Sequence, residues 1–391
     1  MRVTHVITRL IVGGAQENTI ASVLGLRAKP GLEVDLIAGP TTGREGSLEP
    51  VVAAAGCLTR VPELVRAVRP WTDRLAYRRL VAIFREKRPD LVHTHSGKAG
   101  ILGRLAARKA GVPIIVHGIH GPSFGAFQGP LANAVFTTAE RIAGRVTDHF
   151  VTVADAMAEQ YLAAGIGRAD QYTRIFSGFD LAPYLAVRRD AALAAELGLR
   201  EGDLVIGKIA RLFELKGHDD VFAIAREMVR QVPRVRFLFV GDGPWRDRFE
   251  KMAAAPGLAG HFVFTGLVPP SEVPRYVGLM DCLVHLSRRE GLPRALPQAL
   301  AAGKPVVAYD CDGAGEVCHD GTTGFLVRPG DHATLVRRLA QMAAGPDLRA
   351  RLGENGRAFV RERFTIGRLV DDQHALYLRL AAARGVPHPV S

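Results

Sequence analysis

The chain has 391 residues, 48% hydrophobic and 23% charged, which is the composition of a globular protein long enough for two domains. No apolar run reaches the ~18 residues of a membrane-spanning helix, and the first residues lack the apolar core of a signal peptide. The four cysteines form no Cys-x-x-Cys pair, which argues against a cysteine zinc site and predicts free thiols in a reducing cytoplasm.

The net charge of +12 is compatible with three kinds of partner: nucleic acid, an anionic membrane face or a phosphate-rich substrate. A genome that favours arginine codons is a fourth explanation, because arginine is abundant throughout the chain. No nucleic-acid-binding motif and no aromatic stacking platform accompanies the charge, so we do not expect nucleic acid as a partner.

Short apolar segments alternate with helical patterns in the first half of the chain. The predicted strands are residues 4–8, 33–38, 89–95, 112–117, 149–153 and 173–176. Helices are predicted directly after Gly13-Gly14 and over residues 99–110. This alternation is typical of βαβ units with a parallel sheet.

The second half begins the same alternation again. Its predicted strands are residues 203–210, 235–240, 262–265, 282–286 and 306–309, with a helix over 219–230 and a last helix over 367–383. The sequence therefore predicts two doubly wound α/β domains joined near residues 177–200. Ligands of such sheets bind beyond the carboxyl ends of the strands, so a cleft between the domains is the expected site.

The stretch from Glu290 to Gly303 places a carboxylate before a helix of small residues that a glycine ends. The free N–H groups at the start of that helix would seat a phosphate, and Glu290 would grip sugar hydroxyls. The alternative is a glutamate that only favours a helix N-terminus.

Two other segments carry groups suited to a diphosphate. Arg211 and Lys216 lie in one predicted loop, from which both cations could reach one pyrophosphate. Gly13 and Gly14 follow the first strand and would let the backbone approach a diphosphate closely. The alternatives are two solvated cations and an ordinary tight turn.

Polar residues also end two strands of the first half. His117 and His120 follow the strand that begins at residue 112, and His95 and Lys98 follow the strand before it. A metal pair would need further ligands, and none lies nearby in the sequence. Histidines that satisfy structural hydrogen bonds, and a plain polar loop, are the alternatives.

The stretch from Glu290 resembles the donor-site signature of retaining GT-B glycosyltransferases of family 4, in which a second glutamate follows eight positions after the first. Here that position holds Gln298. Arg211 and Lys216-Gly217 resemble the diphosphate clamp of the same family, and the resemblance extends in order over essentially the whole chain. It implies a GT-B fold: two doubly wound Rossmann-like domains of parallel sheets that face a central cleft.

The resemblance also implies domain limits and site residues. Residues 1–180 would be the acceptor-side domain, 181–365 the nucleotide-sugar-binding domain, and 366–391 a C-terminal helix that crosses back to the first. The implied donor-binding residues are Gly13, Gly14, Arg211, Lys216, Glu290 and Gln298. His120, with His117 as second choice, and Glu290 would act in catalysis; His95 and Lys98 would face the acceptor. No metal and no other cofactor is expected.

The implied function is a retaining transfer of sugar from a nucleoside diphosphate donor to a glycan or lipid-linked acceptor. A glutamine at 298 keeps an acceptor for ribose hydroxyls but loses charge. Two other functions stay open: a nucleotide-sugar epimerase on the same fold, and a catalytically weak nucleotide-sugar-binding homologue. We expect a cytoplasmic protein. Its basic segment 64–88 is read either as an ordinary packed helix or as a docking surface for an anionic leaflet.

Overall fold

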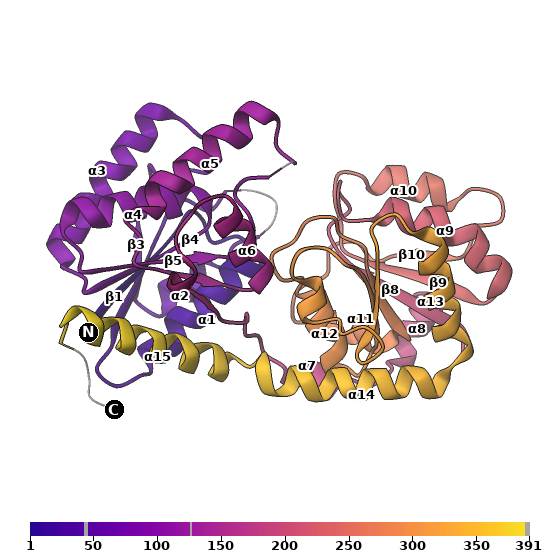
Figure 1. Ribbon diagram of the computed structural model, residues 1–391. Coiled ribbons are helices and arrows are strands. Elements are labelled where there is room, and N and C mark those ends of the chain that lie inside the picture. The colour runs from indigo at the N-terminus through magenta and orange to yellow at the C-terminus, as the bar shows by residue number, and fades with distance from the viewer. Residues whose placement is uncertain (43–45, 126, 388–391) are drawn as a thin grey trace. The chain divides into compact units, whose positions relative to one another are not determined.

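The computed structural model describes residues 1–42, 46–125 and 127–387. It divides into two compact units (Figure 1). Unit 1 comprises Met1–Phe179 together with Phe364–Ser391, and unit 2 comprises Asp180–Arg363. Each unit is an α/β domain with its own parallel sheet, as the alternating pattern predicted.

Seven parallel strands form the sheet of unit 1, in the order β3-β2-β1-β4-β5-β6-β7. Their bounds are β1 Arg2–Ile7, β2 Glu33–Ala38, β3 Leu58–Arg60, β4 Leu91–His95, β5 Ile114–Ile119, β6 His149–Thr152 and β7 Tyr172–Arg174. The central strands β1, β4 and β5 are almost wholly buried, as expected of a parallel sheet covered on both faces. The order reverses between β1 and β4, which is the switch point where ligands of such sheets bind.

Helices cover both faces of this sheet. They are α1 Gly14–Arg27, α2 Glu49–Ala54, α3 Pro70–Lys87, α4 Gly97–Ala110, α5 Pro130–Gly144, α6 Asp155–Ala163 and α15 Ile366–Arg384, with a 3-10 turn η1 at Ala169–Gln171. One core lies under α1 and α15 and the other under α3 and α4. The sequence analysis had not predicted β3, α5 or α6 as separate elements, whereas α3 lies within the segment 64–88 for which a packed helix was one of two readings.

The last helix, α15, belongs to unit 1 and packs beside α1 (Figure 1). The two helices approach so closely that a Cβ at Gly25 would lie 2.3 Å from Val370 Cγ2. Lys29 at the end of α1 also pairs with Asp371 at 2.5 Å. On the buried face of α15, Tyr377 is 0% exposed and reaches the side chains of β1 and β4.

Unit 2 repeats the plan with six parallel strands in the order β10-β9-β8-β11-β12-β13. Their bounds are β8 Leu204–Ile209, β9 Val235–Val240, β10 Phe262–Phe264, β11 Cys282–His285, β12 Val306–Tyr309 and β13 Gly324–Val327. The order reverses between β8 and β11, so the switch point of this sheet lies at the carboxyl ends of those two strands.

The helices of unit 2 again cover both faces of its sheet. They are α7 Ala182–Leu185, α8 Ala191–Glu196, α9 His218–Gln231, α10 Arg246–Ala253, α11 Val273–Leu279, α12 Ala295–Ala301, α13 His332–Ala344 and α14 Pro346–Arg363, with a 3-10 turn η2 at Asp312–Glu316. The core contains an aromatic cluster of Phe222, Phe237, Phe239, Phe249 and Phe262. This rigid sheet positions the loops described below.

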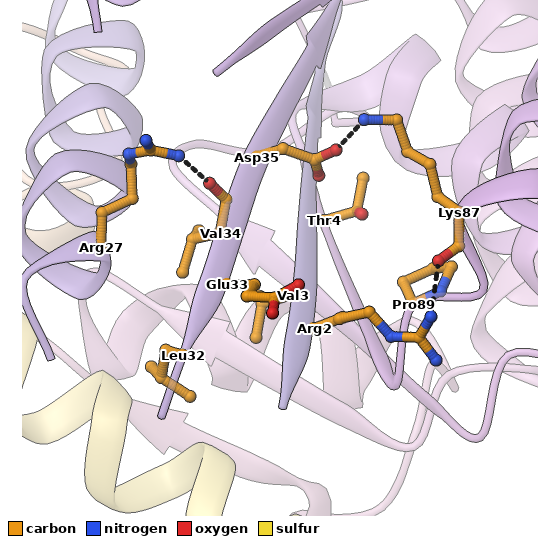
Figure 2. Close-up of a pocket in the computed structure, with 10 residues that line it drawn as sticks. All are labelled: Arg2, Val3, Thr4, Arg27, Leu32, Glu33, Val34, Asp35, Lys87 and Pro89. Carbon is orange, nitrogen blue, oxygen red and sulfur yellow. Dashed lines mark hydrogen bonds and ion pairs between the residues drawn. The ribbon is translucent and has the colours of Figure 1, made fainter. Parts of the chain in front are cut away.

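A cavity of about 410 Å³ opens at the amino ends of β1 and β2 (Figure 2). Its walls are tied to one another: Lys87 pairs with Asp35, and the Arg2 guanidinium donates to the Lys87 carbonyl at 3.1 Å. Ligands of parallel sheets bind at the carboxyl ends, and Arg2, Lys87 and Asp35 here already have partners. We therefore assign this cavity to packing.

The state of the cysteines and the character of the helices can be compared with what the composition predicted. Cys57, Cys282 and Cys318 are buried, and each of the four cysteines is a free thiol. Among the residues that the structure describes, no helix combines the length and the apolar character needed to cross a bilayer.

Candidate functional site

The loops after β8 and β11 meet at the switch point of unit 2. The first loop, residues 210–217, leads from β8 into α9, and the second, residues 286–294, leads from β11 into α12. A Cβ at Gly217 would lie 2.0 Å from the Leu286 carbonyl oxygen, so only glycine permits this approach. Arg288 N–H donates to the Leu215 carbonyl at 2.9 Å, which fixes one loop against the other.

A salt bridge joins the two predicted donor-site residues of these loops. The Lys216 ammonium donates to Glu290 Oε1 at 2.5 Å, and both side chains are about one quarter exposed. Burial raises the pKa of Glu290, but the charge and hydrogen bond of Lys216, together with His285 and Ser287, outweigh burial. The pKa therefore lies below its usual value. Glu290 is therefore an anion at neutral pH, held at the mouth of the switch point.

The backbone at Glu290 is held separately from its side chain. Its N–H donates to Asp312 Oδ2 at 2.7 Å. Asp312 lies in the loop after β12 and has a φ of 49°. The sequence analysis assigned no role to Asp312. The structure shows that Asp312 positions the predicted sugar-binding glutamate.

A buried lysine lies within electrostatic reach of this pair. Lys208 on β8 is 1% exposed, and its Nζ has no hydrogen-bond partner among the described residues. Burial, together with the charge of Lys216, lowers the pKa of Lys208 from 10.5 to about 7, although Asp220 and Glu290 oppose the shift. The sequence analysis missed Lys208 because a lysine inside a predicted strand gives no signal of burial.

Histidines border the same site. His285 at the end of β11 lies 3.7 Å from Glu290 Oε1, and burial lowers the pKa of His285 to about 3. His218 opens α9, and burial lowers its pKa to about 2. Both rings are therefore neutral beside the ion pair.

A second charged group orients the loop after β11. Asp220 on α9 accepts from Arg288 at 2.8 Å and lies 2.9 Å from His332 Nε2. Burial raises the pKa of Asp220, but these hydrogen bonds and the Arg288 charge lower it below its usual value. Asp220 thereby anchors the residue two positions before Glu290.

The other predicted donor residues of unit 2 lie on the same loops. The exposed Arg211 follows β8, and its guanidinium stacks over the Phe213 ring at 5.1 Å. Gln298 is half-buried in α12, and Pro297 lies in the first turn of this helix, where its missing N–H costs little. Gly303 ends the helix segment with a φ of 69°. Because α12 has only seven residues, its role as a phosphate seat stays a prediction.

Unit 1 places its predicted residues at its own switch point. Gly13 caps α1 and Gly14 begins it, directly beyond β1. Lys98 lies in the first turn of α4, but its ammonium pairs with Asp73 and donates to the Ala67 carbonyl. Its side chain is only 12% exposed, so acceptor contact by Lys98 requires exchange of these partners.

Four histidines of unit 1, His5, His93, His95 and His120, form one buried cluster that the sequence did not place together. His95 Nδ1 lies 3.0 Å from His120 Nε2, and His95 Nε2 lies 2.9 Å from His5 Nδ1. His117 points elsewhere and lies 2.9 Å from the Thr94 hydroxyl. His93 completes the cluster with its Nδ1 2.5 Å from the Tyr377 hydroxyl.

Comparison with known proteins agrees with the fold and the order of motifs. A model of "Glycosyl transferase 4-like domain" matches residues 13–176, and one of "Glycosyl transferases group 1" matches residues 190–359. The chain is 32% identical over 353 residues to 2-deoxystreptamine glucosyltransferase of Streptomyces kanamyceticus, covering 83% of this chain and 84% of the relative.

A second relative acts on a lipid-linked sugar by its name. It is UDP-Gal:alpha-D-GlcNAc-diphosphoundecaprenol alpha-1,3-galactosyltransferase of Escherichia coli, 26% identical over 322 residues, 81% of this chain and 82% of the relative. The crystal structure of Anabaena HepE in complex with UDP superposes with a TM-score of 0.80 at 22% identity, over 97% of this chain and 100% of that chain. The protein has the GT-B fold and belongs to the group 1 glycosyltransferases.

Proposed function

We propose that this glycosyltransferase moves a sugar from a nucleoside diphosphate donor to a glycan or lipid-linked acceptor, with retention at the anomeric carbon and without a metal. The Lys216–Glu290 pair at the switch point of unit 2 carries the proposal. It sets a cation for phosphate beside an anion for sugar hydroxyls, and the unpartnered Lys208 lies within electrostatic reach.

The cations act on the leaving diphosphate. Negative charge grows on the diphosphate as the bond to the sugar breaks, so donors fixed in advance lower the barrier most. Lys216 and Arg211 supply such donors from one loop, and Arg211 is exposed and ready to bind. Glu290 accepts hydrogen bonds from sugar hydroxyls, and its backbone bond to Asp312 keeps its position fixed.

Retention follows from attack on the face that the diphosphate leaves. The bond from the anomeric carbon to the diphosphate oxygen breaks, and the acceptor oxygen bonds to the same face of that carbon. A phosphate oxygen takes the acceptor proton, so no protein nucleophile is needed. Arg211 and Lys216 take over the charge of a metal ion in this scheme.

Uridine diphosphate is the donor nucleotide we favour. The E. coli relative uses UDP-Gal by its name, and HepE was crystallised with UDP. Both observations concern those proteins and support the choice only by similarity.

The surface of α3 favours a lipid-linked acceptor. The basic segment 64–88 also carries the apolar side chains Trp71, Leu75, Leu80 and Phe84. The structure divides them: Leu80 and Phe84 are buried, whereas Trp71 is 79% and Leu75 54% exposed. The exposed Arg74 lies on the helix between them, and arginine beside exposed aromatic and aliphatic side chains suits an anionic leaflet. On α5, Leu131 is 80% exposed.

The test is binding and slow hydrolysis of a panel of UDP-, GDP- and ADP-sugars, in the presence of a chelator. One donor should bind and be hydrolysed, after which transfer to lipid-linked sugars in anionic vesicles is measured. Arg211→Ala should reduce turnover by ~100-fold or more, because it removes a donor to the leaving group. Arg230→Ala, at an exposed surface ion pair on α9, is the matched control.

Because Gln298 replaces the second glutamate of the family signature, a function without catalysis also has to be tested. A catalytically weak homologue that only binds nucleotide sugars would bind a donor without hydrolysing it. Conversion between two donor sugars without any acceptor would instead establish an epimerase. Full turnover of Arg211→Ala would contradict the role of the diphosphate clamp.

A further inference from the structure

Five side chains of unit 1 form one unbranched chain of hydrogen-bonding atoms. It runs from His120 Nε2 to His95 Nδ1 at 3.0 Å, and from His95 Nε2 to His5 Nδ1 at 2.9 Å. It continues from His5 Nε2 to the Tyr377 hydroxyl at 3.4 Å, and from there to His93 Nδ1 at 2.5 Å. His5 and His95 each form hydrogen bonds through both ring nitrogens, whereas His93 and His120 stand at the two ends of the chain and use one nitrogen each.

The elements that bring these side chains together are fixed by the sheet. His5 on β1 lies opposite His93 on β4 in the parallel register, and His95 follows two residues along the same face. Gly118 on β5 lies opposite His95, and a Cβ there would come within 2.8 Å of His95 Nδ1 and 3.0 Å of His93 Nε2. Glycine at this position leaves room for the chain of rings.

The imidazoles of the chain are neutral. Burial lowers the pKa of His5 to about 3 and that of His120 to about 4, and it holds those of His93 and His95 well below the usual value. The neighbouring His117 and His149 are neutral for the same reason. A neutral imidazole has one N–H donor and one acceptor nitrogen.

Counting protons leaves two arrangements. Four neutral imidazoles and one phenol carry five protons, and the chain contains four hydrogen bonds, each of which needs one proton. The Tyr377 hydroxyl has no hydrogen-bond partner outside this chain among the described residues, so its proton lies in one of the four bonds. The fifth proton then lies on one of the two end atoms, His93 Nε2 or His120 Nδ1. Both ends are buried and have no hydrogen-bond partner among the described residues.

Each arrangement assigns one tautomer to all four rings. If each residue donates its hydrogen bond in the direction from His120 towards His93, every ring carries its proton on Nε2. If each residue donates in the opposite direction, every ring carries its proton on Nδ1. A mixed set would place two protons, or none, between a pair of nitrogens, or would turn the Tyr377 O–H out of the chain. Either defect leaves buried groups unsatisfied, which costs stability.

We propose that these five residues act as a single two-state hydrogen-bond relay, in which Tyr377 on α15 is a positioning residue for His120. An acceptor group that reaches His120 Nδ1 selects the Nδ1–H form of all four rings, and a donor group selects the Nε2–H form. His120 can thus change from donor to acceptor without a change of charge. The link between this relay and sugar transfer rests on the proposed function. The prediction that the four rings share one tautomer rests only on the hydrogen-bond chain.

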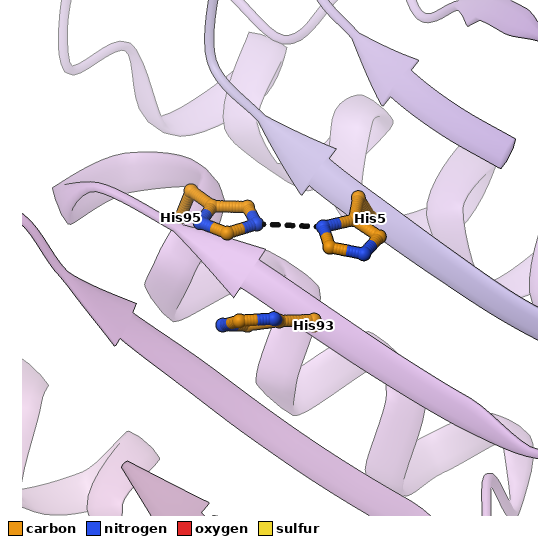
Figure 3. Close-up of side chains that lie close together, drawn as sticks. All are labelled: His5, His93 and His95. Atoms are coloured by element: carbon orange, nitrogen blue, oxygen red, sulfur yellow. Dashed lines mark hydrogen bonds between the residues drawn. The ribbon is translucent and has the colours of Figure 1, made fainter. Parts of the chain in front are cut away.

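A metal ion is the competing occupant of this cluster. His5, His93 and His95 each offer a nitrogen within 4.8 Å of the others (Figure 3). Nitrogens on one tetrahedral zinc lie ~3.3 Å apart, whereas His5 Nδ1 and His95 Nε2 are 2.9 Å apart, which is a hydrogen-bond length. No carboxylate belongs to the group of possible ligands to offset a buried divalent charge. The geometry favours the relay.

The test is a long-range proton–nitrogen NMR spectrum of the full chain labelled with ¹⁵N-histidine, because the nitrogen shifts report each ring's tautomer. We expect His5, His93, His95 and His120 to be neutral and to share one tautomer near neutral pH. Two different tautomers among the four, or stoichiometric zinc in the purified protein, would overturn the relay.

Tyr377→Phe keeps the packed ring and removes the hydroxyl that links His93 to His5. The tautomer of His93 should then become independent of the other three. Tyr161→Phe is the matched control, because Tyr161 is also buried but its hydroxyl lies 2.9 Å from Ser123, outside the relay. If Tyr377→Phe does not fold, the wild-type spectrum alone decides.

A kinetic measurement then separates positioning from packing. With a donor identified, Tyr377→Phe should lower kcat by ~3–10-fold and leave the donor KM unchanged, since it alters only how His120 is oriented. An unchanged kcat, with the shared tautomer intact in the wild type, would remove Tyr377 from catalysis. If no donor is turned over, the proposed function is rejected. The relay is then tested by the NMR spectrum alone.

Discussion

The two sheets share one strand order and differ in what fills the place where that order reverses. In unit 1, β1 and β4 bring together neutral histidines that hydrogen-bond to one another. In unit 2, β8 and β11 lead to an ion pair, Lys216–Glu290, and to the buried Lys208, whose ammonium has no hydrogen-bond partner in the described part of the chain. One topology therefore supports two kinds of site chemistry.

The difference indicates what each site is built to meet. Neutral imidazoles donate or accept hydrogen bonds, and they suit uncharged hydroxyl groups. A buried ammonium without a partner costs stability, and proteins retain such groups where a ligand will use them. The charged site of unit 2 suits a diphosphate, and the neutral site of unit 1 suits hydroxyl groups.

Acid should affect the two units to different extents. In unit 1, burial keeps six histidines neutral: His5, His93, His95, His117, His120 and His149. In unit 2, His218 and His285 behave in this way. Between a pH of ~6.5 and ~4 the unfolded chain binds a proton on each ring and the folded chain does not, so stability falls as the pH falls.

Each such histidine should cost about 2 kcal/mol at a pH of ~5. Hydrogen exchange followed by mass spectrometry should show β4 and β5 losing protection before β8 and β11. His149→Gln should reduce the loss, because an amide can keep the bond to Thr173 and does not titrate. Equal loss in both units would contradict the contrast between them.

At the charged site, we expect Glu290→Gln to change turnover and diphosphate affinity in different ways. Turnover should fall by about 100-fold, because the anion that orients the sugar is lost. Affinity for the free nucleoside diphosphate should hold or rise, since Lys216 no longer shares its charge with a carboxylate. Steady-state kinetics and calorimetry with the diphosphate measure the two effects.

Glu227→Gln is the matched control, because Glu227 forms an exposed ion pair with Arg230 on α9. It should alter neither quantity. A parallel loss of turnover and diphosphate affinity in Glu290→Gln would show that Glu290 only supports the loop, and would remove it from the sugar site.

Lys208→Met should stabilise unit 2 and weaken diphosphate binding. The folded pKa of Lys208 is about 7, below its unfolded value of 10.5. Lys208 therefore destabilises the fold most below a pH of ~7, and this cost disappears as the pH rises towards ~10.5. Tm should rise by about 5 °C or more at a pH of ~6 and by less at a pH of ~9.

Lys251→Met, at an exposed site on α10, is the control for loss of a lysine. A variant that is more stable and binds diphosphate less tightly would show that the buried charge is kept for its ligand. If Lys208→Met lowers Tm at a pH of ~6, the ammonium has a compensating partner in the fold and the contrast with unit 1 fails.

The sequence predicted most strands of the two sheets. It also predicted the strand ends of unit 2 that carry the charged site. Periodicity located the central strands, and Glu290 and Lys216 were named for the same site before the structure joined them. Parallel strands bring their carboxyl ends to one edge, so residues after β8 and β11 were expected to lie close together. The short edge strand β3 has too few residues to show a period.

Contacts that depend on three-dimensional register could not be predicted. His5 and His93 are 88 positions apart and meet only because β1 pairs with β4. Tyr377 joins them from the last helix. The burial of Lys208 and the bond from Glu290 to Asp312 are likewise set by the neighbouring strands, and no local pattern marks them.

The smallest expected effect concerns Gln298, where the family signature has glutamate. Gln298→Glu should tighten nucleoside diphosphate binding by ~5-fold, because a charge-assisted bond to a ribose hydroxyl is stronger than a neutral one by about 1 kcal/mol. The gain should vanish with the 2′,3′-dideoxy form of the same nucleotide, which lacks both ribose hydroxyls. A gain that persists with the dideoxy nucleotide would mean that the carboxylate acts elsewhere. Weaker binding of both would mean that residue 298 lies nearer the diphosphate than the ribose, where a neutral glutamine suits a site whose charge is already balanced by Glu290.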